Sequence, residues 1–88
     1  MRVVWSPSTL QDIVNIYNYI ANYNSGAATR LIDALLNAGD SLISFPRRGR
    51  PVGDNLRELT VVYPYIIRYE VLGNDVTILR VRHGMRRS

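Results

Sequence analysis

Hydrophobic residues recur with two different periods along the chain. After a short β-type run at the N-terminus, they are spaced three and four residues apart as far as residue 42, which is the spacing of one face of an α-helix. From residue 57 onward they alternate with polar residues, which is typical of half-buried β-strands. The pattern therefore predicts an α+β fold, with helices in the first half of the chain and a sheet in the second.

The first helix is predicted to follow a short strand. Arg2–Trp5 is the β-type run, and Ser6 and Pro7 end it. Serine is a preferred N-cap residue, and proline is tolerated at the first helical position because the N–H that it lacks would have no partner there. We therefore expect a helix over Pro7–Tyr23. Its inward stripe is expected to comprise Leu10, Ile13, Val14, Tyr17, Ile20 and Ala21.

A second helix is predicted after a break at residues 24–26. Ser25 can cap it, and it is expected to end near Ser44 because Pro46 disfavours helical geometry in the residue before it. Gly39 lies in the apolar stripe, where we expect it to let the first helix approach closely. The short link predicts that the two helices form an antiparallel hairpin. The stripe comprises Ala28, Leu31, Ile32, Leu35, Gly39 and Leu42.

Three strands are predicted in the second half of the chain. The segment Pro46–Leu56 is rich in proline, glycine and arginine, which indicates a loop. Strands are expected at Arg57–Val62, Tyr65–Leu72 and Val76–Arg82, with a hairpin turn at residues 73–75 between the last two. The predicted fold is therefore a short N-terminal strand, an antiparallel helical hairpin and a three-stranded antiparallel sheet, in a single domain of residues 1–88.

The register of the last hairpin follows from keeping arginines out of the core. A three-residue loop pairs Leu72 with Val76, whereas a two-residue loop would place Arg80 and Arg82 on the buried face. We therefore predict the three-residue register. It assigns to the core face Tyr65, Ile67, Tyr69, Val71, Thr77, Leu79 and Val81. The other face, here called the open face, carries Ile66, Arg68, Glu70, Leu72, Val76, Ile78, Arg80 and Arg82.

Arg68 then lies opposite Arg80 on the open face. Two like charges opposite each other on neighbouring strands repel, so an anion is expected between them. Glu70 is diagonal to Arg80 and offsets only part of the repulsion. The apolar and basic residues together form a patch that a monomer rarely leaves uncovered. We therefore interpret the open face as a binding surface.

Composition narrows the function classes. The 88 residues include no cysteine and one histidine, which excludes a disulfide scaffold, a thiolate zinc site and a histidine-rich metal cluster, so no metal or cofactor is expected. The sequence lacks an apolar run of the roughly 18 residues that a membrane span needs, and it lacks a signal peptide, so a cytoplasmic protein is expected. Eleven arginines against seven acidic residues give a net charge of +4. This charge suits an anionic partner, either nucleic acid or an acidic protein segment.

Several short motifs, taken in order, resemble the RelE/ParE toxin superfamily of type II toxin–antitoxin modules. Their spacing covers nearly the whole chain, and the Arg-Glu-Leu and Arg-Val-Arg-His-Gly elements look like the ParE side of the superfamily. The motifs are Trp5-Ser6-Pro7 with Asp12 and Ile13, Tyr19-Ile20-Ala21, Pro46-Arg47-Arg48-Gly49-Arg50, Leu56-Arg57-Glu58-Leu59, Tyr65-Ile66-Ile67-Arg68-Tyr69-Glu70-Val71 and Val76-Thr77-Ile78-Leu79-Arg80-Val81-Arg82-His83-Gly84.

The resemblance implies a growth-inhibiting toxin that a cognate antitoxin neutralises in a hetero-oligomer. ParE-like members inhibit DNA gyrase, and this is the function that we expect. RelE-like members cut mRNA on the ribosome, and this endoribonuclease activity is the alternative. Its catalytic residues here would be His83, Arg57 and Arg86, but Leu59 and Ile66 stand where further basic residues are expected. A module that simply binds nucleic acid is a third class that the charge allows.

Several candidate residues have a structural interpretation beside the functional one. Histidine is a common acid or base in catalysis, so His83 can act as an acid, yet it can also end the core face beside Tyr65, which is the interpretation that we favour. The arginines of the segment Pro46–Leu56 suit a phosphate-binding loop or an ordinary solvated loop equally well. The candidates for contact with the antitoxin or the target are Arg68, Glu70, Arg80, Arg82, Ile66, Ile78, Arg47, Arg48 and Arg50.

Overall fold

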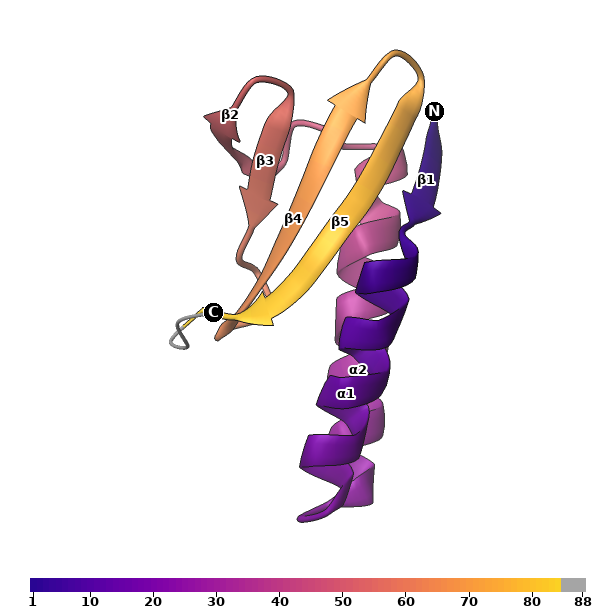
Figure 1. Cartoon of the computed structure of the whole chain (residues 1–88), viewed down its shortest axis with the longest axis vertical. Coiled ribbons are helices and arrows are strands. Elements are labelled where there is room, and N and C mark those ends of the chain that lie inside the picture. Colours follow the sequence, from indigo (N-terminus) through magenta and orange to yellow (C-terminus); the bar gives the residue numbers. More distant parts are fainter. Residues whose placement is uncertain (85–88) are drawn as a thin grey trace.

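The computed structural model describes residues 1–84, which form a helical hairpin and a five-stranded sheet (Figure 1). No helix among these residues is long and apolar enough to cross a membrane. The elements in chain order are β1 (Arg2–Trp5), α1 (Pro7–Ala21), α2 (Ser25–Asp40), the 3-10 turn η1 (Ser41–Ile43), β2 (Arg50–Gly53), β3 (Leu56–Leu59), β4 (Tyr65–Leu72) and β5 (Asp75–His83).

The strands form one mixed sheet in the order β1-β5-β4-β3-β2. β1 pairs in parallel with β5, and the other neighbours are antiparallel. The three antiparallel strands that the sequence predicts are present as β3, β4 and β5, but the prediction of a three-stranded antiparallel sheet is wrong because the sheet has five strands and is mixed. The sequence predicts the N-terminal strand but carries no local signal of its partner. β2 lies in the segment predicted as a loop, and Pro51 is tolerated there because β2 is the edge of the sheet.

The two helices are antiparallel and lie side by side against one face of the sheet (Figure 1). Both begin at side-chain caps: Ser6 Oγ accepts a hydrogen bond from Thr9 N at 3.1 Å, and Asn24 Oδ1 accepts one from Ala27 N at 2.9 Å. The predicted cap, Ser25, is instead the first residue of α2. α1 ends at residue 21 rather than 23, and α2 passes into the 3-10 turn at residue 41. The far end of the hairpin extends beyond the sheet.

α1 is rotated relative to the predicted inward stripe. Ile13 packs against the core, but Leu10 and Val14 are 52% and 50% exposed. Thr9, which the hydrophobic pattern leaves out, is fully buried. Its hydroxyl donates to the Ile78 carbonyl at 2.8 Å, so hydrogen bonding to β5 turns the polar flank of the helix inward.

The core lies between α2 and the sheet. Leu35 and Leu42 are fully buried there against residues of β3, β4 and β5. Gly39 is buried as well, and a Cβ atom at this position would lie 2.3 Å from the Trp5 ring and 2.8 Å from Ile78 Cδ1. The glycine therefore lets α2 approach β1 and β5, and the prediction that it serves contact with the first helix is wrong.

A β-bulge combines the two alternative registers of the last hairpin. Next to the turn, Leu72 pairs with Asp75, which is the two-residue register, and Gly73 in the turn has a φ of +59°. Farther from the turn, Arg68 pairs with Arg80, as the three-residue register predicts. The register shifts between these two regions, and a bulge adds one residue to one strand.

The bulge changes which β5 side chains are buried. Leu79 is the residue without a partner on β4, and the side chains that precede it lie on the faces opposite to those predicted. Val76 and Ile78 are fully buried in the core, so placing them on the open face is wrong. Thr77 is likewise not a core residue, whereas Val81 beyond the bulge is, as predicted.

Candidate functional site on the arginine face of the sheet

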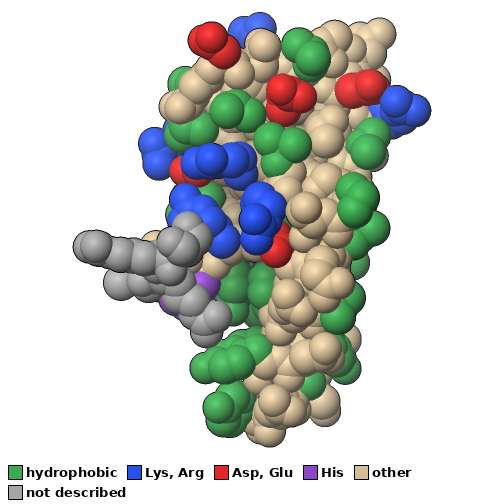
Figure 2. Space-filling model, viewed as in Figure 1, with side chains coloured by type: hydrophobic (Ala, Val, Ile, Leu, Met, Phe, Trp, Pro, Cys, Tyr) green, Lys and Arg blue, Asp and Glu red, His purple; other side chains and the backbone are tan. Residues whose placement is uncertain are grey.

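Charged residues form a row across four strands, on the face of the sheet that does not carry the core. The register places Arg50 beside Glu58, Glu58 beside Arg68, and Arg68 beside Arg80. Arg82, farther along β5, also reaches Glu58. Figure 2 shows basic side chains gathered over the strands, with acidic ones beside them. These five residues are called the arginine face below.

Glu58 is the centre of the arginine face and is only 4% exposed. Its Oε2 accepts from Nη2 of Arg68 at 2.7 Å and from Nη2 of Arg82 at 3.4 Å, and its Oε1 accepts from Nη2 of Arg50 at 3.2 Å. Three cations around one carboxylate leave two positive charges in excess. The guanidinium groups are partly exposed, so they are accessible to a further anion.

Glu58 is ionised at neutral pH despite its burial. Burial alone raises the pKa of a carboxyl group, but the hydrogen bond from Arg68 and the charges of Arg68, Arg82 and Arg50 outweigh that effect. The pKa of Glu58 is therefore lowered from its usual value of 4.5. As an anion, this side chain offsets part of the repulsion among the arginines that surround it.

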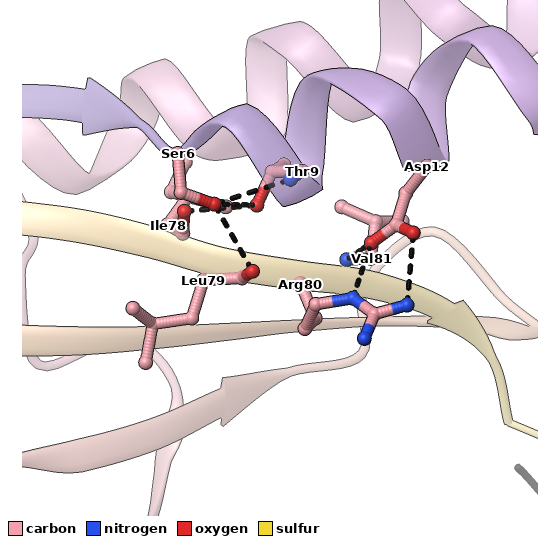
Figure 3. Close-up of polar contacts among 7 residues, drawn as sticks. All are labelled: Ser6, Thr9, Asp12, Ile78, Leu79, Arg80 and Val81. Atoms are coloured by element: carbon pink, nitrogen blue, oxygen red, sulfur yellow. Dashed lines mark hydrogen bonds and ion pairs between the residues drawn. The ribbon is translucent and has the colours of Figure 1, made fainter.

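Arg80 has its own carboxylate partner on α1 (Figure 3). Its Nε and Nη2 donate to the two carboxylate oxygens of Asp12 at 2.9 and 3.0 Å, and this pairing raises the pKa of Arg80. Arg68 and Arg80, which lie opposite each other, are therefore each paired with a carboxylate of the chain itself, Arg68 with Glu58 and Arg80 with Asp12. The anion expected between them is supplied in part by these two side chains.

The cap residue of α1 and side chains of its first turns continue the edge of the sheet beyond the end of β1 (Figure 3). The hydroxyls of Thr9 and Ser6 donate to the two carbonyls at the bulge, of residues 78 and 79, at 2.8 and 3.1 Å. Asp12 Oδ2 accepts from the Val81 N–H at 2.9 Å. Sequence reasoning missed this role, although three short polar residues spaced three apart on a helix were its signal.

Tyr69 and Arg57 hold the arginine-rich loop that precedes β2. The Tyr69 hydroxyl donates to the Pro46 carbonyl and accepts from Gly49 N, both at 2.8 Å. Arg57 Nη1 donates to the carbonyls of Gly49 at 2.7 Å and of Arg47 at 3.3 Å. Arg57, a candidate catalytic cation, is therefore engaged with the backbone of this loop.

The candidate nuclease residues are not gathered at the arginine face. His83 lies opposite Tyr65, a core-face residue, and the two rings meet edge to face with centroids 5.4 Å apart. Arg57 lies opposite Tyr69, also on the core face. Both are thus on the other side of the sheet from Arg68. The third predicted member, Arg86, lies outside the described residues.

The remaining predicted contact residues divide into three groups. Ile66 and Glu70 are partly buried on the open face. Ile78 is fully buried, so the prediction that it contacts a partner is wrong. Arg47 and Arg48 are exposed on the loop before β2. Within residues 1–84, no three potential ligand side chains come together to hold a metal ion.

Comparison with known proteins identifies relatives along the whole chain. The model of the ParE toxin family of type II toxin–antitoxin systems, parDE, matches residues 3–87. Toxin RelE2 of Caulobacter vibrioides is 45% identical over 85 residues, which are 97% of each chain. Toxin RelE1 of the same organism is 35% identical and covers 94% of this chain and 92% of its own. The structure of the chromosomal ParDE TA system from P. aeruginosa matches with a TM-score of 0.81, covering 94% of this chain and 95% of that one; at 23% identity this shows the shared fold.

Proposed function

The chain belongs to the ParE toxin family of type II toxin–antitoxin systems, and from this premise we propose that it inhibits DNA gyrase and is neutralised by a cognate antitoxin. A type II toxin is held inactive by a bound antitoxin protein, so the fold must present surface both to that protein and to the cellular target. The arginine face and the loop before β2 are the surfaces with the chemistry for these contacts.

The observation that favours gyrase over mRNA cleavage is that the candidate nuclease residues His83 and Arg57 lie on the core face, on the other side of the sheet from the arginine face. Cleavage of RNA by its own 2′-hydroxyl needs a base, an acid and a cation that converge on one phosphate. Here the His83 ring meets the Tyr65 ring edge to face on the core face, and Arg57 donates to loop carbonyls. The arginines of the other face are paired with Glu58 and with Asp12. This arrangement supports a toxin that acts by binding.

The arginine face supplies the binding chemistry. Three guanidinium groups surround Glu58 with two positive charges in excess, and their outer N–H groups are accessible. A guanidinium accepts a carboxylate in a bidentate geometry, which gives both attraction and orientation. The face therefore suits a protein partner that places acidic side chains over the strands.

The alternative function is ribosome-dependent mRNA cleavage. It is favoured by the relatives' names, because two that match nearly the whole chain are called RelE toxins. Their names do not state a target. The two functions predict different damage in a cell, so they can be separated directly.

Inducible expression of the chain, with DNA breaks and mRNA ends mapped in the same culture, tests the proposal. We expect DNA breaks and growth arrest without cuts at fixed codon positions, and we expect both effects to disappear when the antitoxin is co-expressed. Codon-position cuts that vanish in His83→Ala would overturn the proposal and would make His83 the general acid. The unfolding curve of purified His83→Ala serves as the control for loss of structure.

A further inference from the structure

An exposed aromatic ring stands at the end of the helical hairpin, outside the arginine face. Phe45, the only phenylalanine of the chain, is 65% exposed. It lies beside an open hollow of about 770 Å³. The hollow is lined by Ser41, Phe45, Pro46, Arg47 and Arg48. A large apolar side chain that is exposed beside basic groups is a feature of interaction surfaces.

Hydrogen bonds within the fold hold this segment. The Phe45 N–H donates to the Ser41 carbonyl at 3.0 Å, and the Arg48 N–H donates to the Phe45 carbonyl at 3.1 Å. The buried Tyr69 hydroxyl holds Pro46 and Gly49. Because the segment is already ordered, a partner that binds it does not have to order it, which preserves affinity.

The two arginines of the segment carry charge that the fold does not neutralise. No carboxylate of residues 1–84 lies within ion-pair distance of Arg47 or Arg48, whereas Arg50, next along the chain, is paired with Glu58. Arg48 is oriented by a hydrogen bond from its Nη1 to Ser41 Oγ at 2.8 Å. These cations are therefore positioned beside the ring and lack an anionic partner among the described residues.

The backbone of the loop does not form a phosphate cradle. Such cradles need several free N–H groups that point to one spot. Here the N–H groups of Phe45, Arg48 and Gly49 are used within the fold, and Pro46 has none. Recognition is left to the ring and the two guanidinium groups, which together fit an apolar side chain and a nearby carboxylate. A second hollow of about 310 Å³ shares Arg47 with the first, so an extended segment can continue into it toward Arg57.

We propose that Phe45, Arg47 and Arg48 form a docking site for a short extended segment of the antitoxin, in which a large apolar side chain packs on Phe45 and a neighbouring carboxylate binds the two arginines. The charges of the site select an acidic partner over a second copy of this chain, whose net charge is +4. This inference rests on the proposed function only in that the chain has an antitoxin. It does not depend on gyrase being the target.

The test uses the full chain and its purified cognate antitoxin. Titration calorimetry compares wild type with Phe45→Ser and with the double variant Arg47→Gln/Arg48→Gln. Matched controls are Tyr23→Ser, an exposed aromatic at the far end of the hairpin, and Arg30→Gln, an exposed arginine on α2 without a carboxylate partner among residues 1–84. Thermal unfolding of each variant confirms that it is folded. If Phe45→Ser does not fold, the arginine variant still tests the docking site.

We expect Kd to rise roughly tenfold or more in Phe45→Ser and roughly ten- to a hundredfold in the arginine variant, while both controls stay within about twofold of wild type. The arginine variant should also show a weaker dependence of Kd on salt. Equal affinity of wild type and both variants would overturn the docking site and leave the proposed function standing. A wild type that fails to bind the antitoxin would contradict both.

Two further outcomes would assign the site to another ligand. Loss of gyrase inhibition with unchanged antitoxin affinity would make it a target contact. Loss of binding to a single-stranded oligonucleotide, again with unchanged antitoxin affinity, would make it a nucleic-acid contact. Either result would overturn the proposal.

Discussion

At the residue scale, Glu58 on β3 links four strands, because one arginine from each of β2, β4 and β5 donates to its carboxylate. Glu58→Gln keeps the shape of the side chain and removes its charge. We expect the free energy of unfolding at pH 7 to fall by about 1–3 kcal/mol, since the arginines then repel one another but are partly solvated. Urea unfolding measures the loss. Glu70→Gln, on the same face, is the control and should change stability by less than about 0.5 kcal/mol.

The lowered pKa of Glu58 also sets the sign of a pH dependence. A carboxyl group whose pKa is lower in the folded state stabilises the protein above its unfolded value, here about 4.5, and this contribution is lost as the pH falls. Between pH 7 and about pH 3.5, wild type should therefore lose more unfolding free energy than Glu58→Gln does. Equal losses in the two proteins would show that Glu58 titrates normally.

Tyr69 is a second buried polar residue whose role is measurable. Tyr69→Phe keeps the ring in the core but removes the hydroxyl, which leaves the Pro46 carbonyl and the N–H of Gly49 without their partner. We expect a loss of about 1–3 kcal/mol in unfolding free energy. Tyr23→Phe, on an exposed ring, should change nothing measurable. A Tyr69→Phe protein as stable as wild type would mean that water replaces both hydrogen bonds.

At the scale of elements, side chains of α1 form hydrogen bonds with the backbone of β5 beyond the end of β1, where a neighbouring strand would otherwise pair. Asp12→Ala removes both the acceptor for the Val81 N–H and the partner of Arg80, whereas Asp12→Asn can keep the first. We expect losses of about 2–3 kcal/mol for Asp12→Ala and about 1 kcal/mol for Asp12→Asn. Chemical unfolding distinguishes them, with Asp33→Ala on α2 as the control. If the two Asp12 variants are equally stable, the hydrogen bond to β5 contributes little.

Contact between α2 and the sheet depends on the absence of a side chain at Gly39. Gly39→Ala raises helix propensity by about 1 kcal/mol, but the added Cβ atom would lie 2.3 Å from the Trp5 ring. Overpacking of this kind costs about 1–3 kcal/mol, so we expect a net loss of stability together with a changed Trp5 fluorescence. A more stable Gly39→Ala protein with unchanged fluorescence would show that the ring moves freely.

Periodicity predicts the elements better than it predicts their pairing. The helical hairpin and the two long strands β4 and β5 follow from local patterns, and the structure confirms them within a few residues. The hydrophobic pattern does not predict β2, because Pro51 and Gly53 are residues typical of loops. The sequence allows two registers for the last hairpin, one for a two-residue loop and one for a three-residue loop. The bulge combines the two registers, because it keeps Arg80 out of the core and still buries Ile78.

At the scale of the whole molecule, the sequence predicts the cations of the site but not their partners. Alternation along β4 and β5 places Arg68 and Arg82 on one face, as the structure confirms. Their counter-ions come from elsewhere in the fold. Asp12 is 68 residues from Arg80 in the sequence, and Glu58 is reached only through the pairing of β3 with β4. No local pattern carries such contacts.

The distribution of paired and unpaired charge gives the molecule two basic surfaces of different character. The arginines over the sheet form ion pairs with Glu58 and with Asp12, whereas Arg47 and Arg48 have no carboxylate partner in residues 1–84. Paired arginines are held in position, and unpaired ones attract an acidic chain more strongly. A binding toxin can use both surfaces, because its action needs tight contact with a target and equally tight capture by an antitoxin.

The proposed inhibition of gyrase is tested most directly by measuring how purified DNA gyrase supercoils relaxed plasmid in the presence of the purified chain. We expect supercoiling to fall as the protein is added and to recover when the antitoxin is supplied in equal amount. Leu35→Asp, which places a charge at a fully buried core position, should be unfolded and inactive, and it is the control. Supercoiling at the full rate in an excess of folded wild-type protein would contradict the proposed inhibition of gyrase.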